Sequence, residues 1–313
     1  MKNFKILNII LSLLLLSSML GCDFDTIETK NSDTKINETY TSLISDAVSD
    51  EYSVDSEVDY WTGIYFEKED MEDRTCLVFG NSYTGSYSKS IIDKMNSYTT
   101  DIYLDDNNIE FGLRSDTGEL AYINFMNSDF FDTQPYLPET DDPIGTAISL
   151  AIDVASNYVD DINEYTQIFD EDESITRYKE RAGKTHQITY HFVTFAKKIN
   201  GYFSSDYITV KVTSKGTLAS IMIGDIGAFD DITLDFDKTA MEQSISKKIE
   251  STYQESKLNV KKSNIDDQKI VLTPDGDICM YSKIAIYGVD DTEIETQTGI
   301  RVLTILKKAK MND

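Results

Sequence analysis

Histidine, cysteine, proline and tryptophan are all scarce in this chain of 313 residues. It has two His, three Cys, four Pro and one Trp. Zinc sites in proteins are built mainly from clusters of His and Cys, and the chain has too few of either for such a cluster. His186 and His191 lie five residues apart in one strand-like run, so their side chains should point to opposite faces. We therefore predict no metal ligands and no cofactor.

Motifs of nucleophilic catalysis are absent or incomplete. Ser86–Lys89 and Ser244–Lys247 match Ser-x-x-Lys, but the Lys-Thr-Gly that penicillin-binding enzymes also need occurs only in the wrong order, at Gly183–Thr185. The same Gly-Lys-Thr is not a phosphate loop, because Tyr178 stands where the first glycine is required. Neither histidine lies near a Gly-x-Ser-x-Gly turn. We therefore predict no catalytic residue.

Positive charge is in short supply. The chain has 29 Lys and Arg against 55 Asp and Glu, a net charge of −26. A surface this acidic repels phosphate backbones, so we expect no nucleic-acid partner. Acidic runs at 105–106, 141–142 and 170–173 offer oxygen atoms to calcium, but none has EF-hand spacing. Solvated loops are the simpler interpretation, and the acidity favours either solubility outside the cell or a cationic partner.

The first 22 residues have the pattern of an export signal. A basic start precedes an apolar run at 6–16, which is too short to span a bilayer permanently. The run leads to Met19-Leu20-Gly21-Cys22. This ending resembles the lipobox of bacterial lipoproteins, in which the Cys thiol receives a diacylglycerol and the chain is cut just before it. The resemblance implies a lipid on Cys22 that holds the protein to the outside of the cell membrane. An uncleaved signal anchor is the alternative.

The residues after Cys22 are polar and acidic as far as about 58. This composition buries too little apolar surface to offset the entropy of ordering, so 22–58 is predicted to be a flexible tether. A coil of that length reaches roughly 30–35 Å on average. Beyond it, Cys76 and Cys279 lie in strand-like runs. An extracytoplasmic location permits a disulfide, but we favour two free thiols in the core.

One pattern occurs twice, about 98 residues apart. Apolar residues alternate around a turn glycine at 109–125 and again at 208–223, as they do in β-hairpins. Each hairpin is followed by a helix with an aspartate cap. Asp142 precedes the helix predicted at 143–158, and Asp237 precedes the second. The pattern predicts an internal duplication of a hairpin-then-helix unit.

A likeness to a known family appears between 185 and 229. An aromatic strand (Tyr190–Phe195), a turn at Asn200-Gly201, a second strand (Asp206–Val210) and a late Gly216 occur in that order. This series resembles PepSY-type domains, the small α+β modules of peptidase propeptides and bacterial envelope lipoproteins, most clearly over 142–231. The resemblance implies a helix packed on a short antiparallel sheet, and binding or inhibition of proteases. The family has no catalytic residues to carry over.

Together these patterns predict an α+β fold in which antiparallel sheets pack with a few helices and PepSY-like units are duplicated. The expected order is a signal peptide (1–21), a tether (22–58), an N-terminal α+β region (59–140), a PepSY-like unit (141–235) and a second, divergent unit (236–313). The predicted function is a surface-tethered, non-catalytic binding or regulatory lipoprotein whose partner is an exported protease or another envelope protein. The alternatives are a carboxylate-based hydrolase acting on cell-wall polysaccharide and a calcium-stabilised structural protein.

Overall fold

The structure is a computed structural model that describes residues 54–55, 64–92, 96–126, 137–138, 140–181, 184–230, 232–256, 259–289 and 295–307. The predicted signal peptide, Cys22 and most of the predicted tether lie outside these ranges. Among the described residues the two α-helices are α3 (Pro143–Ala155) and α4 (Lys238–Ser256), and the 3-10 turns are η3 (Ile162–Glu164) and η4 (Glu171–Glu173). The strands are β1 (Val54–Asp55), β2 (Ile64–Phe66), β3 (Arg74–Val78), β4 (Asn81–Ile92), β5 (Thr99–Asp105), β6 (Glu110–Arg114), β7 (Leu120–Asn124), β8 (Thr166–Ile168), β9 (Ile175–Arg181), β10 (Lys184–Ile199), β11 (Tyr202–Thr213), β12 (Leu218–Ile223), β13 (Asn259–Leu272), β14 (Ile278–Val289) and β15 (Glu295–Lys307).

The predicted α+β class, in which antiparallel sheets pack with a few helices, is wrong. The described residues are 53% strand and 16% helix, and the strands form one large mixed sheet. The described residues of the expected N-terminal α+β region (59–140) form strands and contain no α-helix. The missed strands carry polar residues on both faces. In β4, for example, four serines break the alternation by which a half-buried strand is recognised.

Both predicted hairpins are confirmed, and they join at their second strands. β6 pairs with β7 and β11 with β12, each antiparallel with a register shift, at Gly112/Leu113 in the first and Lys211/Val212 in the second. β7 then pairs antiparallel with β12, placing Ile123 opposite Ile221. These two residues hold equivalent positions in the repeated pattern, 98 residues apart. An approximate two-fold axis therefore passes between them and relates the two hairpins.

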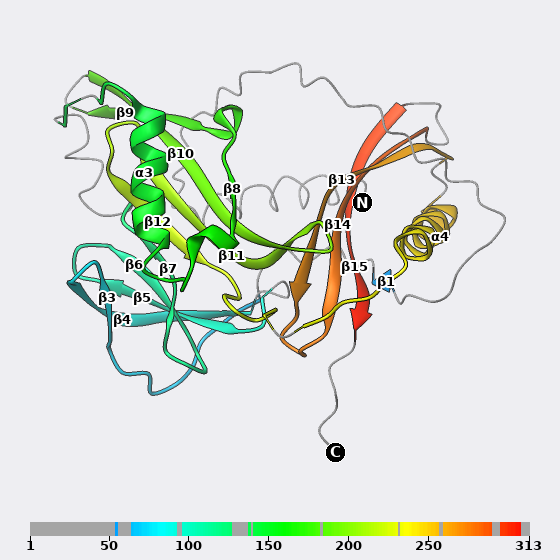
Figure 1. The fold of residues 1–313 in the computed structure, drawn as a ribbon, viewed down its shortest axis with the longest axis horizontal. Helices are drawn as coiled ribbons and strands as arrows, with labels where there is room; N and C mark the ends of the chain where they lie inside the picture. Colours follow the sequence, from blue (N-terminus) through cyan, green and yellow to red (C-terminus); the bar gives the residue numbers. More distant parts are fainter. Residues whose placement is uncertain are drawn as a thin grey trace, which may run out of the picture.

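The predicted helices are also confirmed, and each covers its own part of the sheet (Figure 1). α3 packs on β10 and β11, and its buried side chains are Ala147, Ala151, Val154 and Ala155. Their core includes residues of both hairpins. α4 contacts β13, β15 and β1 over a separate core. We call β2–β12 with α3 the N-terminal lobe, and α4 with β13–β15 and β1 the C-terminal lobe.

The two lobes meet at a short parallel pairing and a buried carboxylate. β11 and β13 pair parallel only at Phe203↔Lys269 and Ser204↔Ile270. Beside this contact, Asp225 is 1% exposed. Its Oδ1 accepts hydrogen bonds from the amide and hydroxyl of Ser97, and its Oδ2 accepts one from the hydroxyl of Ser205. The backbone N–H of Leu272 in β13 donates to that same Ser205 hydroxyl. Asp225 thus links the strands of one lobe to the first strand of the other.

The sheet is bent, as the chain length between its first two strands requires. β1 and β2 stand at opposite ends of the path of eleven hydrogen-bonded strands. Eleven strands laid flat would extend about 48 Å. Asp55 and Ile64 are nine residues apart, which span at most about 32 Å. β1, which lies inside the predicted tether (22–58), pairs with Leu303 and Thr304 of β15, so the far end of that segment is part of the sheet.

The expectation of free core thiols is confirmed. Cys76 and Cys279 are unbridged, are 6% and 2% exposed, and belong to different hydrophobic clusters. Burial raises the pKa of Cys76 to about 11, so its reactive thiolate is scarce at neutral pH.

We predict that both thiols are inert in the native protein. In the mature chain carrying Cys22→Ser, a thiol reagent such as Ellman's should modify neither cysteine until denaturant is added, and then modify both. Intact mass should be the same with and without reductant. A mass increase of two hydrogens on reduction would contradict the structure.

Candidate functional site

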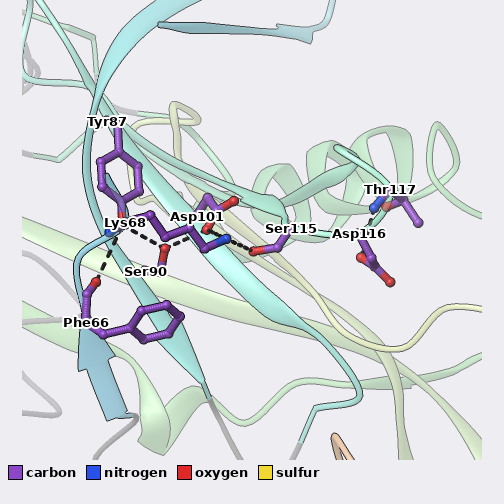
Figure 2. Close-up of polar contacts among 8 residues, drawn as sticks. All are labelled: Phe66, Lys68, Tyr87, Ser90, Asp101, Ser115, Asp116 and Thr117. Atoms are coloured by element: carbon purple, nitrogen blue, oxygen red, sulfur yellow. Dashed lines mark hydrogen bonds and ion pairs between the residues drawn. The ribbon is translucent and has the colours of Figure 1, made fainter. Parts of the chain in front are cut away.

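A lysine and a buried aspartate form an ion pair in the N-terminal lobe (Figure 2). Lys68, in the connection between β2 and β3, donates from Nζ to Asp101 Oδ1 at 2.6 Å and to Ser115 Oγ at 3.0 Å. Ser90 donates to the same Oδ1 at 2.6 Å, and its hydroxyl lies 2.8 Å from Tyr87 Oη. The backbone N–H of Lys68 donates to Tyr87 Oη. The cluster therefore ties the β2–β3 connection to β4, β5 and the β6–β7 turn.

The charges in this cluster are balanced rather than poised for catalysis. Burial alone would raise the pKa of Asp101, but hydrogen bonds from Lys68, Ser90 and Ser115 outweigh it and lower the pKa. The carboxylate is thus ionised at neutral pH and accepts the hydrogen bond from Lys68 Nζ. Lys68 Nζ is already bonded to Asp101 and Ser115, and Ser90, at 0% exposure, cannot reach a substrate. The cluster is therefore structural: it holds the β2–β3 connection against the neighbouring strands.

A second buried carboxylate, Asp206 on β11, is also fully bonded. It is 0% exposed, and its Oδ1 accepts from Tyr165 Oη at 2.7 Å while its Oδ2 accepts from the Gly227 amide at 3.0 Å. Lys197 Nζ lies 3.9 Å from Oδ2, 2.5 Å from Asp230 Oδ1 and 3.2 Å from Glu164 Oε2. Burial raises the pKa of Asp206, although the hydrogen bonds from Tyr165 and Gly227 and the charge of Lys197 all favour the ionised form.

This second cluster contains three carboxylates, those of Asp206, Asp230 and Glu164, but the buried one cannot face a substrate. A glycosidase requires two carboxyl groups that face the sugar. Asp206 faces the protein interior, whereas the side chains of Asp230 and Glu164 are 54% and 62% exposed. Lys197, bridging the three carboxylates, joins the β10 strand to η3 and to the loop after β12. The cluster is therefore an ion network that fixes loops.

The two histidines share strand β10, as the sequence predicts. His191 is 5% exposed, lies beside the ring of Phe169, and has its Nδ1 3.0 Å from Ser174 Oγ. Burial lowers its pKa, so the ring is neutral at neutral pH. No sequence pattern indicates this serine–histidine contact, because Ser174 lies outside any catalytic motif. The described residues include no group of three or more His, Cys, Asp or Glu positioned to hold a metal ion.

In each of the three acidic runs, an aspartate accepts hydrogen bonds from nearby backbone N–H groups. Asp105 Oδ1 accepts hydrogen bonds from the amides of Asn107 and Ile109 in the turn after β5. Asp142 caps α3 by accepting from the Gly145 amide. Asp170 caps η4 in the same way. Each run therefore contains a carboxylate with a local role in a turn or cap, as aspartates in such positions commonly do.

The most unusual exposed feature is the tip of the β3–β4 hairpin. Val78 pairs with Asn81, so Phe79 and Gly80 form a two-residue turn, and both have positive φ angles, 50° and 75°. Such turns favour Asn-Gly, because a side chain beyond the Cβ is disfavoured in the left-handed region. Phe79 nevertheless occupies the position and is 47% exposed, and Leu77 beside it is 71% exposed. The hairpin thus presents two large apolar side chains to solvent.

Comparison with known proteins gives no relative: no family model, no curated protein and no solved structure matches the chain. The lipobox and PepSY-type resemblances consequently rest on the residues quoted for them, and Cys22 lies outside the described residues.

We predict that Lys68→Met destabilises the protein by about 1–3 kcal/mol, because Asp101 loses its cation while remaining largely buried. Urea unfolding of the variant and of the unsubstituted protein measures the difference. Lys283→Met, at an exposed position on β14, is the matched control and should change stability by less than about 0.5 kcal/mol. Equal effects of the two substitutions would show that the contact between Lys68 and Asp101 does not stabilise the fold.

The raised pKa of Asp206 predicts a pH dependence of stability. A carboxyl group whose pKa is higher in the folded state binds its proton more tightly there, so stability falls as pH rises from the usual carboxyl pKa of about 4 through the folded value. Asp206→Asn removes this contribution. Stability of the variant should decline less than that of the unsubstituted protein over this window in urea titrations at a series of pH values. Identical pH profiles would show that Asp206 does not contribute.

Proposed function

We propose that this protein is a lipid-anchored, non-catalytic binding protein of the bacterial envelope, whose partner is another exported protein bound at the β3–β4 hairpin. The observation that carries the proposal is Phe79, an exposed aromatic residue in a left-handed turn. Left-handed backbone costs an ordinary residue about 1–2 kcal/mol. An unfavourable conformation kept at an exposed position is best explained by a use for the side chain.

The character of the strand edge supports binding at this hairpin. Among the described residues β3 pairs only with β4, which leaves its other edge open to an extended segment of a partner. β9 likewise has β10 as its one described neighbour, but Arg177, Lys179 and Arg181 place charge along it. Charged residues, lysine above all, are a common protection of a sheet edge against unwanted pairing. β3 has one charged residue, Arg74 at its start, and carries the exposed Leu77 near the turn, so it is the better docking edge.

The anchor is proposed from the sequence. The Leu20-Gly21-Cys22 ending is the basis for a lipid on Cys22, and the acyl chains of a lipid contribute about 0.8 kcal/mol of membrane affinity for each buried CH₂ group. Within the described ranges, neither helix is long and apolar enough to cross a bilayer. A hydrolase is the weaker proposal, because the best-placed buried carboxylate, Asp206, is turned away from solvent.

The test is capture of envelope proteins on the immobilised mature chain, with mass spectrometry to identify what is retained. Leu77→Ser combined with Phe79→Asn should abolish retention of the specific partner. Stability should change by no more than about 1 kcal/mol, because relief of the left-handed strain offsets the lost contacts of a half-buried ring.

Tyr178→Asn is the matched control, since Tyr178 is an aromatic residue of β9 that is 55% exposed. This variant should retain the partner. If the hairpin variant and the control capture the same proteins in the same amounts, the hairpin is not the binding site.

A further inference from the structure

Charge is divided very unequally between the two lobes. The sequence from 64 to 237, which contains β2–β12 and α3, has 13 Lys and Arg and 32 Asp and Glu, a net charge of −19. The sequence from 238 to 313, which contains α4 and β13–β15, has 12 of each and no net charge. Exposed lysines of this lobe lie on α4 and on all three of its long strands: Lys238, Lys247, Lys261, Lys283 and Lys307.

The segment that follows Cys22 joins the fold at this same neutral lobe. β1 pairs with β15 at Leu303 and Thr304 and also contacts α4. Figure 1 places β1 and α4 at one end of the longest axis, with β3 and β4 at the other. Val54 is 32 residues from Cys22, and a coil of that length averages roughly 30 Å. The attachment point and the strands β3 and β4 therefore lie at opposite ends of the longest axis.

We infer that the C-terminal lobe is the surface that faces an anionic membrane, and that the acidic N-terminal lobe is held away from it. The inference rests on the lipid anchor proposed above and adds the orientation of the protein on its membrane. An anionic lipid surface repels the lobe of net charge −19, whereas the neutral lobe has lysines to place near the headgroups. The β3–β4 hairpin then points away from the membrane, toward other envelope proteins.

Salt dependence separates this electrostatic orientation from one imposed by the tether alone. The field of the lipid surface decays over a Debye length of about 8 Å at physiological ionic strength and about 3 Å at 1 M salt. The preference of the C-terminal lobe for the membrane side should therefore weaken at high salt and on zwitterionic vesicles. A tether that set the orientation by length alone would give the same orientation at physiological salt, at high salt and on zwitterionic vesicles.

The experiment uses the full lipidated protein in vesicles containing about 30 mol% phosphatidylglycerol, with acceptor dyes on the lipid headgroups. A donor dye is attached at Thr239→Cys on α4 or at Ser82→Cys on β4, both exposed hydroxyl positions. Energy transfer to the membrane should be at least about twofold higher from position 239, and the ratio should fall toward one at high salt. Reversing four exposed lysines together, with K238E, K247E, K261E and K283E, should also remove the preference.

The outcomes separate the inference from the proposal beneath it. Vesicle flotation with equal transfer from both positions, or with more transfer from position 82, would overturn the orientation while leaving the anchor intact. Failure of the protein to float with the vesicles would contradict the lipid anchor, and the inference would fall with it.

Discussion

The pairing of Ile123 with Ile221 is the contact on which the N-terminal lobe depends. A two-stranded hairpin is at best marginally stable in water, and each of the repeated hairpins is one. Antiparallel pairing of β7 with β12 joins them into a continuous sheet whose apolar face is wide enough for α3. Ile123 and Ile221, at 0% and 1% exposure, lie at the centre of that face. The approximate two-fold axis between them explains why the same alternation appears twice in the sequence.

Buried carboxylates then connect this sheet to what surrounds it. Asp225 joins the hairpin strands to β13, Asp206 fixes the loops beside β10, and Asp101 holds the β2–β3 connection that precedes the exposed hairpin. Each accepts hydrogen bonds from two or more groups, which offsets the cost of removing it from water. In a chain so rich in acidic residues, these three buried carboxylates stabilise the fold.

The sequence identified the elements that have a clear period and missed those that do not. Alternation at 109–125 and 208–223 and the aspartate caps at 142 and 237 located both hairpins and both helices. β4 and much of β13 were missed because serines, lysines and aspartates occupy both of their faces. That error made helices seem a larger part of the fold than they are. The pairing of β1 with β15 joins residues about 250 positions apart, which no local pattern reveals.

The candidate site was still less accessible to the sequence. Phe79-Gly80 does not look like a hairpin turn, because turns of this geometry usually carry Asn or Asp before the glycine. Only the φ angle of Phe79 and its exposure mark it as unusual. Cys22 is the reverse case, since its surrounding residues resemble a lipobox while the described fold begins at Val54. The proposed function thus rests on Cys22, identified from the sequence, and on Phe79, identified from the backbone geometry.

The central claim is a lipid anchor on Cys22. The most direct test is to purify the protein from its membrane and measure the mass of its N-terminal peptide. A lipid anchor predicts that Cys22 is the first residue and that it carries a diacylglycerol on its sulfur. A peptide beginning at Met1, or one beginning at an unmodified Cys22, would contradict the account.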